Sequence, residues 1–438
     1  MLPDSAEAAM ETSVSRTGEQ HCTALAAATF FLLLCSYYVL RPVRETMAVL
    51  AGPDRVPWLF TGTFVATLAV VPLFGWLVRR VPRDWLIPAV YGPMIACLAG
   101  FYVVFRAGPT TVSAAAFFIW LSLFNLLVTS LFWSRVGDAF TTEQARRCYG
   151  YITAGGTAGA VTGPALTTLL AERISTASLL LVSMGLLLFA GGSLLFLRPP
   201  SDVSAAPSQR PIGGSVLAGI AQTFRDPLLA ALAGLVICYS SISTVLYQEM
   251  TGIVGKAYAD AGARTAYFAR IDLSVNLLSL ALQLLATRFL LRSWRLGWCL
   301  GLVPAVMLLG LVGVGVAPTA GLFAVVQVLH RAGEFALSKP SREVLFTTVD
   351  AENRYKAKNF IDTAVYRTND AASIWLTTAV RSLGGNAIWI VALPVTMAWL
   401  LLSWSTGRRY DRRASNAVAD PSANSDTGGQ PGAPPSRA

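Results

Sequence analysis

The sequence is poor in charge: only 13% of its 438 residues are Asp, Glu, Lys or Arg, and it contains four lysines and two histidines. Hydrophobic residues make up 54% of the chain, and the mean hydropathy of +0.55 lies outside the range of ordinary soluble domains. The net charge of +10 is therefore interpreted as membrane topology and attraction to anionic lipid headgroups, not as nucleic-acid binding. The composition predicts a protein that crosses a membrane many times.

Paired cysteines and catalytic motifs are also missing. The six cysteines are scattered in or beside apolar stretches, which predicts neither a disulfide framework nor a zinc site. The chain has no Ser-His-Asp set, no His-Glu-x-x-His motif and no phosphate-binding Gly-Lys loop. We therefore expect no enzyme activity, no metal and no cofactor. Residues 1–21 hold several acids and a single arginine, so no signal peptide is expected before the first apolar stretch.

Long apolar runs dominate the rest of the chain, and each is close to the roughly 20 residues that a helix needs to cross a bilayer. The predicted spans lie near 22–40, 56–78, 85–105, 113–134, 148–170, 175–197, 227–251, 266–290, 296–316, 319–338, 358–380 and 386–405. The expected fold is all-α, with twelve transmembrane helices in two pseudo-symmetric bundles of six. We expect bundles at 22–198 and 227–406, cytoplasmic segments at 1–21 and 199–226, and a disordered cytoplasmic tail at 407–438.

Arginine and lysine are unevenly distributed between the two sets of short loops. They gather at 79–83, 135–147, 198–225, 288–295, 339–358 and 408–413, whereas the alternate loops hold few of them. Because such residues mark the cytoplasmic side, both termini are predicted to be cytoplasmic. The expected location is a bacterial inner membrane, with lipids as neighbours and the protein as a monomer.

The densest charge lies at 335–370, which contains three of the four lysines between two apolar spans. Ionisable residues inside a membrane are costly and normally face a bundle interior or an aqueous cavity. We therefore take Asp362, Arg367 and Asp370 in the eleventh span as candidate site residues. The alternative is a cytoplasmic loop whose cations only fix the topology.

A second charged group ends the first span, where Arg41 and Glu45 are four residues apart and share a helix face, with Arg44 beside them. The alternative is a surface anchor, but apolar residues resume after Glu45, as expected if the helix continues along a cavity. Glu249 lies 204 residues after Glu45, and a Phe-Thr-Thr motif recurs at an offset of 206. These matches favour two halves in parallel repeat, as in facilitator-type transporters.

Spans eight, ten and eleven carry further polar stripes. Asp272, Asn276 and Gln283 fall on one face of span eight, either lining a cavity or bonding to neighbouring helices. Glu334 is the candidate in span ten. In span eleven, a stripe that contains Lys358 and Asp362 lies opposite one that contains Arg367 and Asp370, and spacing alone does not say which one faces substrate.

Two of these segments resemble the ATP/ADP translocase family, nucleotide transporters with a facilitator-like fold. That family has Tyr-x-x-Leu-Arg-x-x-Lys-acid in its first span, and this chain has Tyr37, Leu40, Arg41, Arg44 and Glu45. The family's Lys-x-Lys-x-x-Ile-Asp in the eleventh span is matched by Lys356, Lys358, Ile361 and Asp362. The resemblance implies ATP binding and ATP:ADP antiport by a divergent bacterial relative. Arg44 replaces a lysine: the positive charge is kept, but an arginine fork and a lysine ammonium recognise phosphate differently.

The function expected is a secondary transporter that moves an anionic, phosphorylated solute by alternating access. Its proposed binding residues are Arg41, Arg44, Lys358, Asp362, Arg367 and Asn276. Its proposed coupling or gating residues are Glu45, Glu249, Asp272, Glu334 and Asp370. The alternative within transport is a facilitator-type permease or proton symporter for another organic anion or a cell-wall fragment. A receptor or scaffold is the alternative outside transport, but it would not require charges within several spans.

Overall fold

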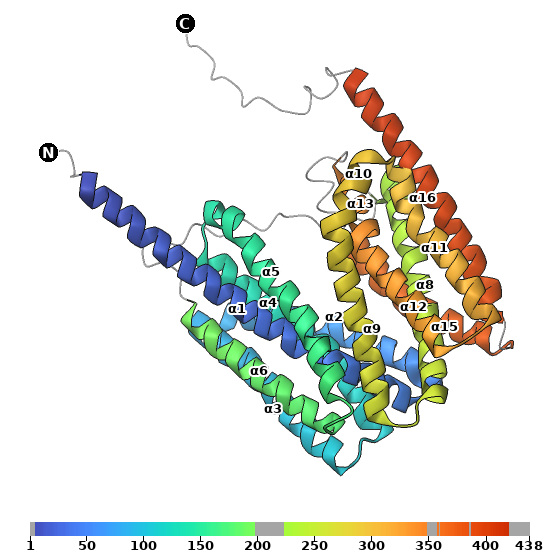
Figure 1. Cartoon of the computed structure of the whole chain (residues 1–438), viewed down its shortest axis with the longest axis horizontal. Helices are drawn as coiled ribbons and strands as arrows, with labels where there is room; N and C mark the ends of the chain where they lie inside the picture. The colour runs from blue at the N-terminus through green and yellow to red at the C-terminus, as the bar shows by residue number, and fades with distance from the viewer. Residues whose placement is uncertain (1–4, 198–222, 348–356, 359, 385–386, 420–438) are drawn as a thin grey trace, which may run out of the picture.

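The computed structural model describes residues 5–197, 223–347, 357–358, 360–384 and 387–419. All regular elements in these residues are helical, and none is a strand. The first half consists of α1 (Ser5–Ala51), α2 (Val56–Arg80), α3 (Arg83–Ala107), α4 (Thr111–Ala139), α5 (Thr142–Leu170) and α6 (Thr176–Phe196), with a short 3-10 turn, η1 (Pro53–Arg55), between α1 and α2. Each half is one bundle in Figure 1.

The second half contains three helices with π-helical turns. Its elements are α8 (Pro227–Ala257), α9 (Ala261–Leu282), η2 (Gln283–Thr287), α10 (Arg288–Ser293), α11 (Leu296–Val316), α12 (Ala320–Gly333), η3 (Glu334–Ser338), α13 (Lys339–Phe346), η4 (Phe360–Val365), α15 (Tyr366–Arg381) and α16 (Ala387–Ala419). The turns η2 and η3 join α9 to α10 and α12 to α13, and η4 leads into α15. Counted as continuous rods, the described residues form six helices in each half, which confirms the predicted fold class.

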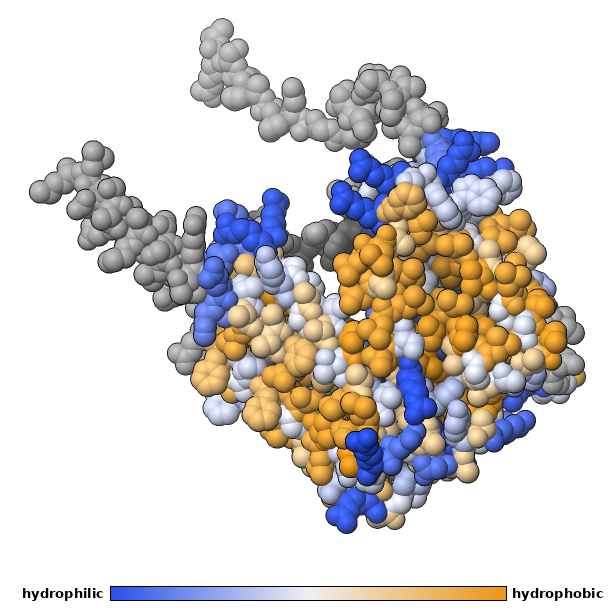
Figure 2. All heavy atoms as spheres, viewed as in Figure 1, coloured by the Kyte–Doolittle hydropathy of each residue, from blue (hydrophilic) through white to orange (hydrophobic). Residues whose placement is uncertain are grey.

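Hydropathy alone identifies most of these helices as candidate membrane spans. Eight helical stretches in the described residues are long and apolar enough to cross a membrane, beginning with Gly18–Ala51. The helices α12 and α15 contain only 14 and 16 residues and are not among them. Figure 2 shows an apolar band across the middle of the visible face, with hydrophilic side chains at both ends. This surface suits a multi-pass membrane protein.

Polar side chains at the helix starts explain several of the boundaries. Thr110 and Thr141 form reciprocal capping boxes with Ser113 and Gln144, so that backbone N–H groups at the start of α4 and α5 are satisfied. At the other end of the chain α16 continues to Ala419, so the tail expected to be disordered from 407 begins with helix. Most of the expected linker at 199–226 lies outside the described residues.

The two halves have separate hydrophobic cores. One core is built on buried side chains of α1, α3, α4 and α6, and the other on α8, α9, α11 and α12. The halves meet mainly through α5 against α9, α1 against α8 and α9, and α2 against α15. Two separate cores with a limited contact between them are consistent with bundles that move as rigid bodies.

Glycines on α5 allow a close crossing with α1. A Cβ atom added at Gly155, Gly159 or Gly163 would collide with a backbone carbonyl oxygen of α1, at Ala27, Phe31 and Cys35 respectively. Backbones approach this closely in membranes only where residues are small. These three glycines therefore serve helix packing, whereas Gly150 in the same helix faces open space.

We expect Gly159→Ala to destabilise the protein by about 1–3 kcal/mol, because the added methyl group meets backbone atoms that cannot move independently. The matched control is Gly150→Ala in the same helix, which has no neighbouring atom within 4 Å. Alanine there should be neutral or stabilising by up to about 1 kcal/mol. Thermal unfolding of the two purified variants measures the difference, and equal midpoints would show that the crossing tolerates a wider separation.

Contacts between the halves gather at the end remote from both termini. There Arg270 on α9 donates to Glu172 at 3.1 Å, and Trp375 on α15 donates to Thr61 on α2 at 3.0 Å. Figure 1 shows the halves converging at this end and separating toward the end that carries the N- and C-termini. These contacts therefore join the two halves at the end of the molecule that is remote from the termini.

Candidate functional site

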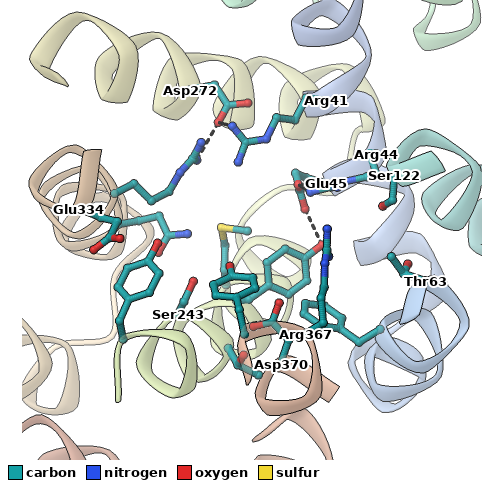
Figure 3. A pocket seen from close by; sticks show the side chains of 18 of the residues that line it. Arg41, Arg44, Glu45, Thr63, Ser122, Ser243, Asp272, Glu334, Arg367 and Asp370 are labelled. Atoms are coloured by element: carbon teal, nitrogen blue, oxygen red, sulfur yellow. Dashed lines mark hydrogen bonds and ion pairs between the residues drawn. The ribbon is translucent and has the colours of Figure 1, made fainter. Parts of the chain in front are cut away.

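A cavity of about 570 Å³ lies between the two halves. Its walls come from α1, α2 and α4 of the first half and from α8, α9, α12, η3, α13, η4 and α15 of the second. Figure 3 shows charged side chains from both halves pointing into the same space. A site shared between two bundles is the arrangement in which a relative movement of the bundles changes access to a bound ligand.

The wall formed by α1 carries the charged group predicted at the end of the first span. α1 continues through Pro42 and past Glu45, as the apolar residues after Glu45 suggested. Arg44 donates from Nη2 to Glu45 Oε1 at 2.5 Å, and its guanidinium also lies 4.9 Å from the ring centre of Phe118. Glu45 accepts a second hydrogen bond on Oε2 from the hydroxyl of Tyr247 on α8, at 2.5 Å. Glu45 therefore ties α1 of one half to α8 of the other.

Asp272 on α9 forms a second tie between the halves. Its Oδ1 lies 2.7 Å from Nη1 of Arg331 on α12 and 3.3 Å from Nη1 of Arg41 on α1. The side chain of Asp272 is only 4% exposed, so its charge is removed from water and compensated by the two guanidinium groups. Of the stripe predicted on span eight, Asp272 thus reaches the cavity.

A third ion pair lies at the π-helical turn η3. Glu334, the first residue of this turn, accepts hydrogen bonds from Nη2 and Nη1 of Arg342 at 2.5 and 3.3 Å. The guanidinium of Arg342 lies 6.0 Å from the ring centre of Tyr239. The turn also changes the helical phase, so that Glu334, Lys339 and Arg342 all line the cavity. π-Helical turns of this kind are frequent at functional sites.

The wall formed by η4 and α15 takes residues from both stripes predicted on span eleven. Asp362, Tyr366, Arg367 and Asp370 all line the cavity. Asn369, seven residues after Asp362, instead donates to Ser241 Oγ and to the backbone oxygen of Ile237 on α8. Two features decide which residues face the cavity: the π-helical turn η4, which is wider than an α-helical turn, and the packing of α15 against α8. A regular spacing of 3.6 residues per turn predicts neither of them.

Three of the predicted site residues lie away from the cavity. Lys358 donates from Nζ to both carboxylate oxygens of Glu343, at 2.7 and 2.6 Å. Asn276 donates to the backbone oxygen of Ala160 on α5, in the contact between halves. Glu249 lies 3.8 Å from Nη1 of Arg381. None of the three side chains is among those that line the cavity, although the charge of Lys358 acts on Asp362.

Sequence reasoning did not select Arg331, Lys339 and Arg342 as site residues. The bond of Arg331 to Asp272 joins residues 59 positions apart in the chain, which local spacing does not reveal. Arg342 lies eight residues after Glu334, and that spacing could have indicated the pair if the π-helical turn between them had been known. Within the described residues, no group of three or more His, Cys, Asp or Glu is placed to hold a metal ion.

The cavity carries nearly balanced charge. Its acids are Glu45, Asp272, Glu334, Asp362 and Asp370, and its cations are Arg41, Arg44, Arg331, Lys339, Arg342 and Arg367. Four of the cations have acid partners within 4 Å, whereas Lys339 and Arg367 have none among the described residues. An excess of one cation and two unpaired cationic side chains favour an anionic ligand.

Comparisons with known proteins agree with this geometry. The family model described as "Major Facilitator Superfamily" matches residues 26–364. The ADP,ATP carrier protein 2 of Chlamydia pneumoniae is 21% identical over 488 aligned positions, which cover 89% of this chain and 88% of the carrier.

Two solved structures show the same fold. One is the nucleoside transporter NupG, with a TM-score of 0.62 and 14% identity over 88% of this chain and 98% of the transporter. The other is a bacterial homolog of the human lysosomal transporter Spinster in an inward-facing, unoccupied conformation, with a TM-score of 0.59 and 12% identity over 90% of this chain and 97% of the homolog. The family match covers most of the twelve-helix architecture that surrounds the cavity. The chain belongs to the Major Facilitator Superfamily.

Proposed function

We propose that this transporter moves an anionic, phosphorylated solute across the membrane by alternating access, and that adenine nucleotides are its first candidates. The observation that carries the proposal is the convergence of six cationic side chains from both halves in one cavity. Phosphate oxygens form charge-assisted hydrogen bonds with arginine and lysine, and arginine adds bidentate geometry. The similarity to the ADP,ATP carrier protein 2 of Chlamydia pneumoniae supports ADP and ATP as the solutes to test first.

Alternating access is supported by how the halves are joined. The ties from Glu45 to Tyr247 and from Arg41 to Asp272 lie in the cavity and cross between the halves. Such contacts can be exchanged for contacts to a bound anion, while each half keeps its own core. The side chains proposed to bind the solute are Arg41, Arg44, Arg331, Lys339, Arg342 and Arg367.

The location proposed is a bacterial inner membrane, with both termini in the cytoplasm and the protein as a monomer. Both ends of the described chain lie on the same side in Figure 1, as an even number of spans requires. The cavity would then open toward the cytoplasm. We propose no catalytic role and no cofactor.

A proton-coupled permease for another organic anion is the second candidate. The five acids that line the cavity favour it, because carboxylates in such a position can carry protons. It differs from nucleotide exchange in its response to gradients: a proton symporter needs a pH gradient, whereas an exchanger needs solute on the opposite side.

Uptake into proteoliposomes tests the proposal. Purified full-length protein should take up labelled ADP, ATP or AMP and should discriminate against adenosine, which lacks the phosphate. Preloading with unlabelled ADP should accelerate uptake by an exchanger, and a pH gradient should accelerate uptake by a symporter. Equal uptake of adenosine and its phosphates would contradict the proposed role of the cationic side chains.

A further inference from the structure

Asp370 differs from the other acids in the cavity in having the least positive charge around it: within the described residues it forms no ion pair, and only the charge of Arg367 acts on it. Its Oδ1 accepts a hydrogen bond of 2.6 Å from the hydroxyl of Ser240 on α8, and no ion pair involves it in the described part of the chain. The side chain is half-buried between α8 and α15 at the edge of the cavity. No ion pair among the described residues stabilises a charged carboxylate at this position.

The remaining four acids are each compensated by positive charge. Glu45, Asp272 and Glu334 have arginine nitrogens within 2.5, 2.7 and 2.5 Å. Asp362 is exposed to the cavity, and the charges of Arg342, Lys358 and Lys339 act on it. Of the five, Asp370 therefore has the weakest electrostatic reason to remain ionised.

The nearest cationic residue on the same helix is Arg367, one turn before Asp370. Figure 3 shows both side chains on the α15 wall of the cavity. Arg367 has no ion-pair partner among the described residues and is exposed to the cavity. It is thus available to an anionic ligand, and its positive charge is the one that a ligand would neutralise beside Asp370.

No other cationic group among the described residues that pack around Asp370 adds positive charge beside its carboxyl group. On its own helix the titratable neighbour is Tyr366, and the preceding turn η4 contributes Asp362. From α8 the cavity receives Tyr239, Tyr247 and hydroxyl groups, and from α2 it receives Phe60, Thr63 and Phe64. α16, which also packs against α15, contributes no residue to this cavity.

We propose that Asp370 is a proton-binding site coupled to anion binding at Arg367. When an anionic group binds Arg367, the positive field that favours the Asp370 carboxylate is cancelled, so the carboxylate takes up a proton from water. By linkage, protonation of Asp370 increases the affinity for the anion by the same factor. The only bond formed is O–H on the carboxyl group, and the proton leaves to water when the anion leaves. This coupling rests on the proposed function, because it requires an anionic ligand. It means that the anion and a proton are transported together.

Infrared difference spectroscopy of the full-length protein tests the proton site without any substrate. A pH titration of the empty protein should show the carbonyl stretch of a protonated carboxyl group that appears, as the pH is lowered, before those of the better compensated cavity acids. Asp370→Asn should lose this band, and the control Asp362→Asn, at another cavity acid, should retain it. A band that is unchanged in Asp370→Asn would overturn the assignment.

Calorimetry with ADP as the probe tests the coupling. In buffers of different ionisation enthalpy, binding to the wild type should take up about one proton, and the affinity should fall by up to about tenfold per pH unit as the pH rises. Asp370→Asn should bind ADP with no proton uptake and little pH dependence. Equal proton uptake by the two proteins would overturn the coupling. Absence of ADP binding at every pH would contradict nucleotide recognition instead, and the infrared band would still decide the proton site.

Discussion

Asp272→Asn should destabilise the protein by about 3–5 kcal/mol, the cost of removing one partner from a buried ionic network. Its Oδ1 compensates both Arg331 and Arg41, and its side chain is only 4% exposed. Asparagine keeps the shape but leaves two largely buried guanidinium groups, with side chains only 19% and 13% exposed, without their counter-charge. Because Arg41 belongs to the first half and Asp272 to the second, the variant should also weaken the contact between halves.

The control for Asp272→Asn is Glu143→Gln. Glu143 pairs with Arg147 at 3.5 Å, but its side chain is 85% exposed, and exposed pairs contribute less than about 1 kcal/mol. Both variants remove one negative charge opposite an arginine, so only burial and the number of partners differ. Thermal and denaturant unfolding of purified proteins in the same detergent measures the effect. A loss of similar size in the two variants would mean that Asp272 does not anchor the network.

Arg44→Gln should weaken ADP binding by about tenfold to a hundredfold, since one charge-assisted hydrogen bond contributes roughly 1.5–3 kcal/mol and 1.4 kcal/mol is a factor of ten. The side chain lies in the cavity and is 16% exposed, so a bound phosphate can reach its guanidinium. Arg44→Lys should be milder, because the charge is kept and only the planar fork is lost. Equilibrium binding to well-folded protein gives the comparison.

Lys358→Gln is the matched control for Arg44→Gln. Sequence resemblance placed Lys358 in the site, but the structure pairs it with Glu343 outside the cavity lining. Its replacement should change ADP affinity less than threefold, as expected for an exposed ion pair worth about 0–1 kcal/mol. Equal losses in Lys358→Gln and Arg44→Gln would return Lys358 to the binding site and would require a cavity different from the one described.

Much of the fold could be predicted because it depends on local properties of the chain. Apolar runs of about 20 residues predicted the twelve helices and their division into two halves. Sequence analysis also selected four charged residues that line the cavity: Arg41, Arg44, Glu45 and Asp272. They were selected because an ionisable side chain in an apolar helix costs free energy unless it has a partner or a function.

The remaining features of the site depend on contacts between distant residues. Arg331 and Arg41 meet at Asp272, although all three lie on different helices. The π-helical turns η3 and η4 change the helical phase, so regular spacing did not predict that Arg342 meets Glu334 or that Asp362 and Arg367 share a wall. The predicted correspondence of Glu45 with Glu249 stays a prediction; a superposition of the halves should bring the two Cα atoms within one helical turn, about 5.4 Å.

The most direct test of the central claim is protection of a cavity residue by substrate. Ser243 lines the cavity and is labelled in Figure 3, so Ser243→Cys in a chain freed of its six native cysteines provides a reporter inside the site. Ser382→Cys, exposed after α15 and outside the lining, is the control. We expect saturating ADP to slow thiol modification at position 243 at least about tenfold, as a bound ligand at ten times its Kd would, and to leave position 382 unchanged, whereas adenosine should protect neither. Modification at position 243 that proceeds at the same rate with and without ADP or any other phosphorylated solute would contradict the account.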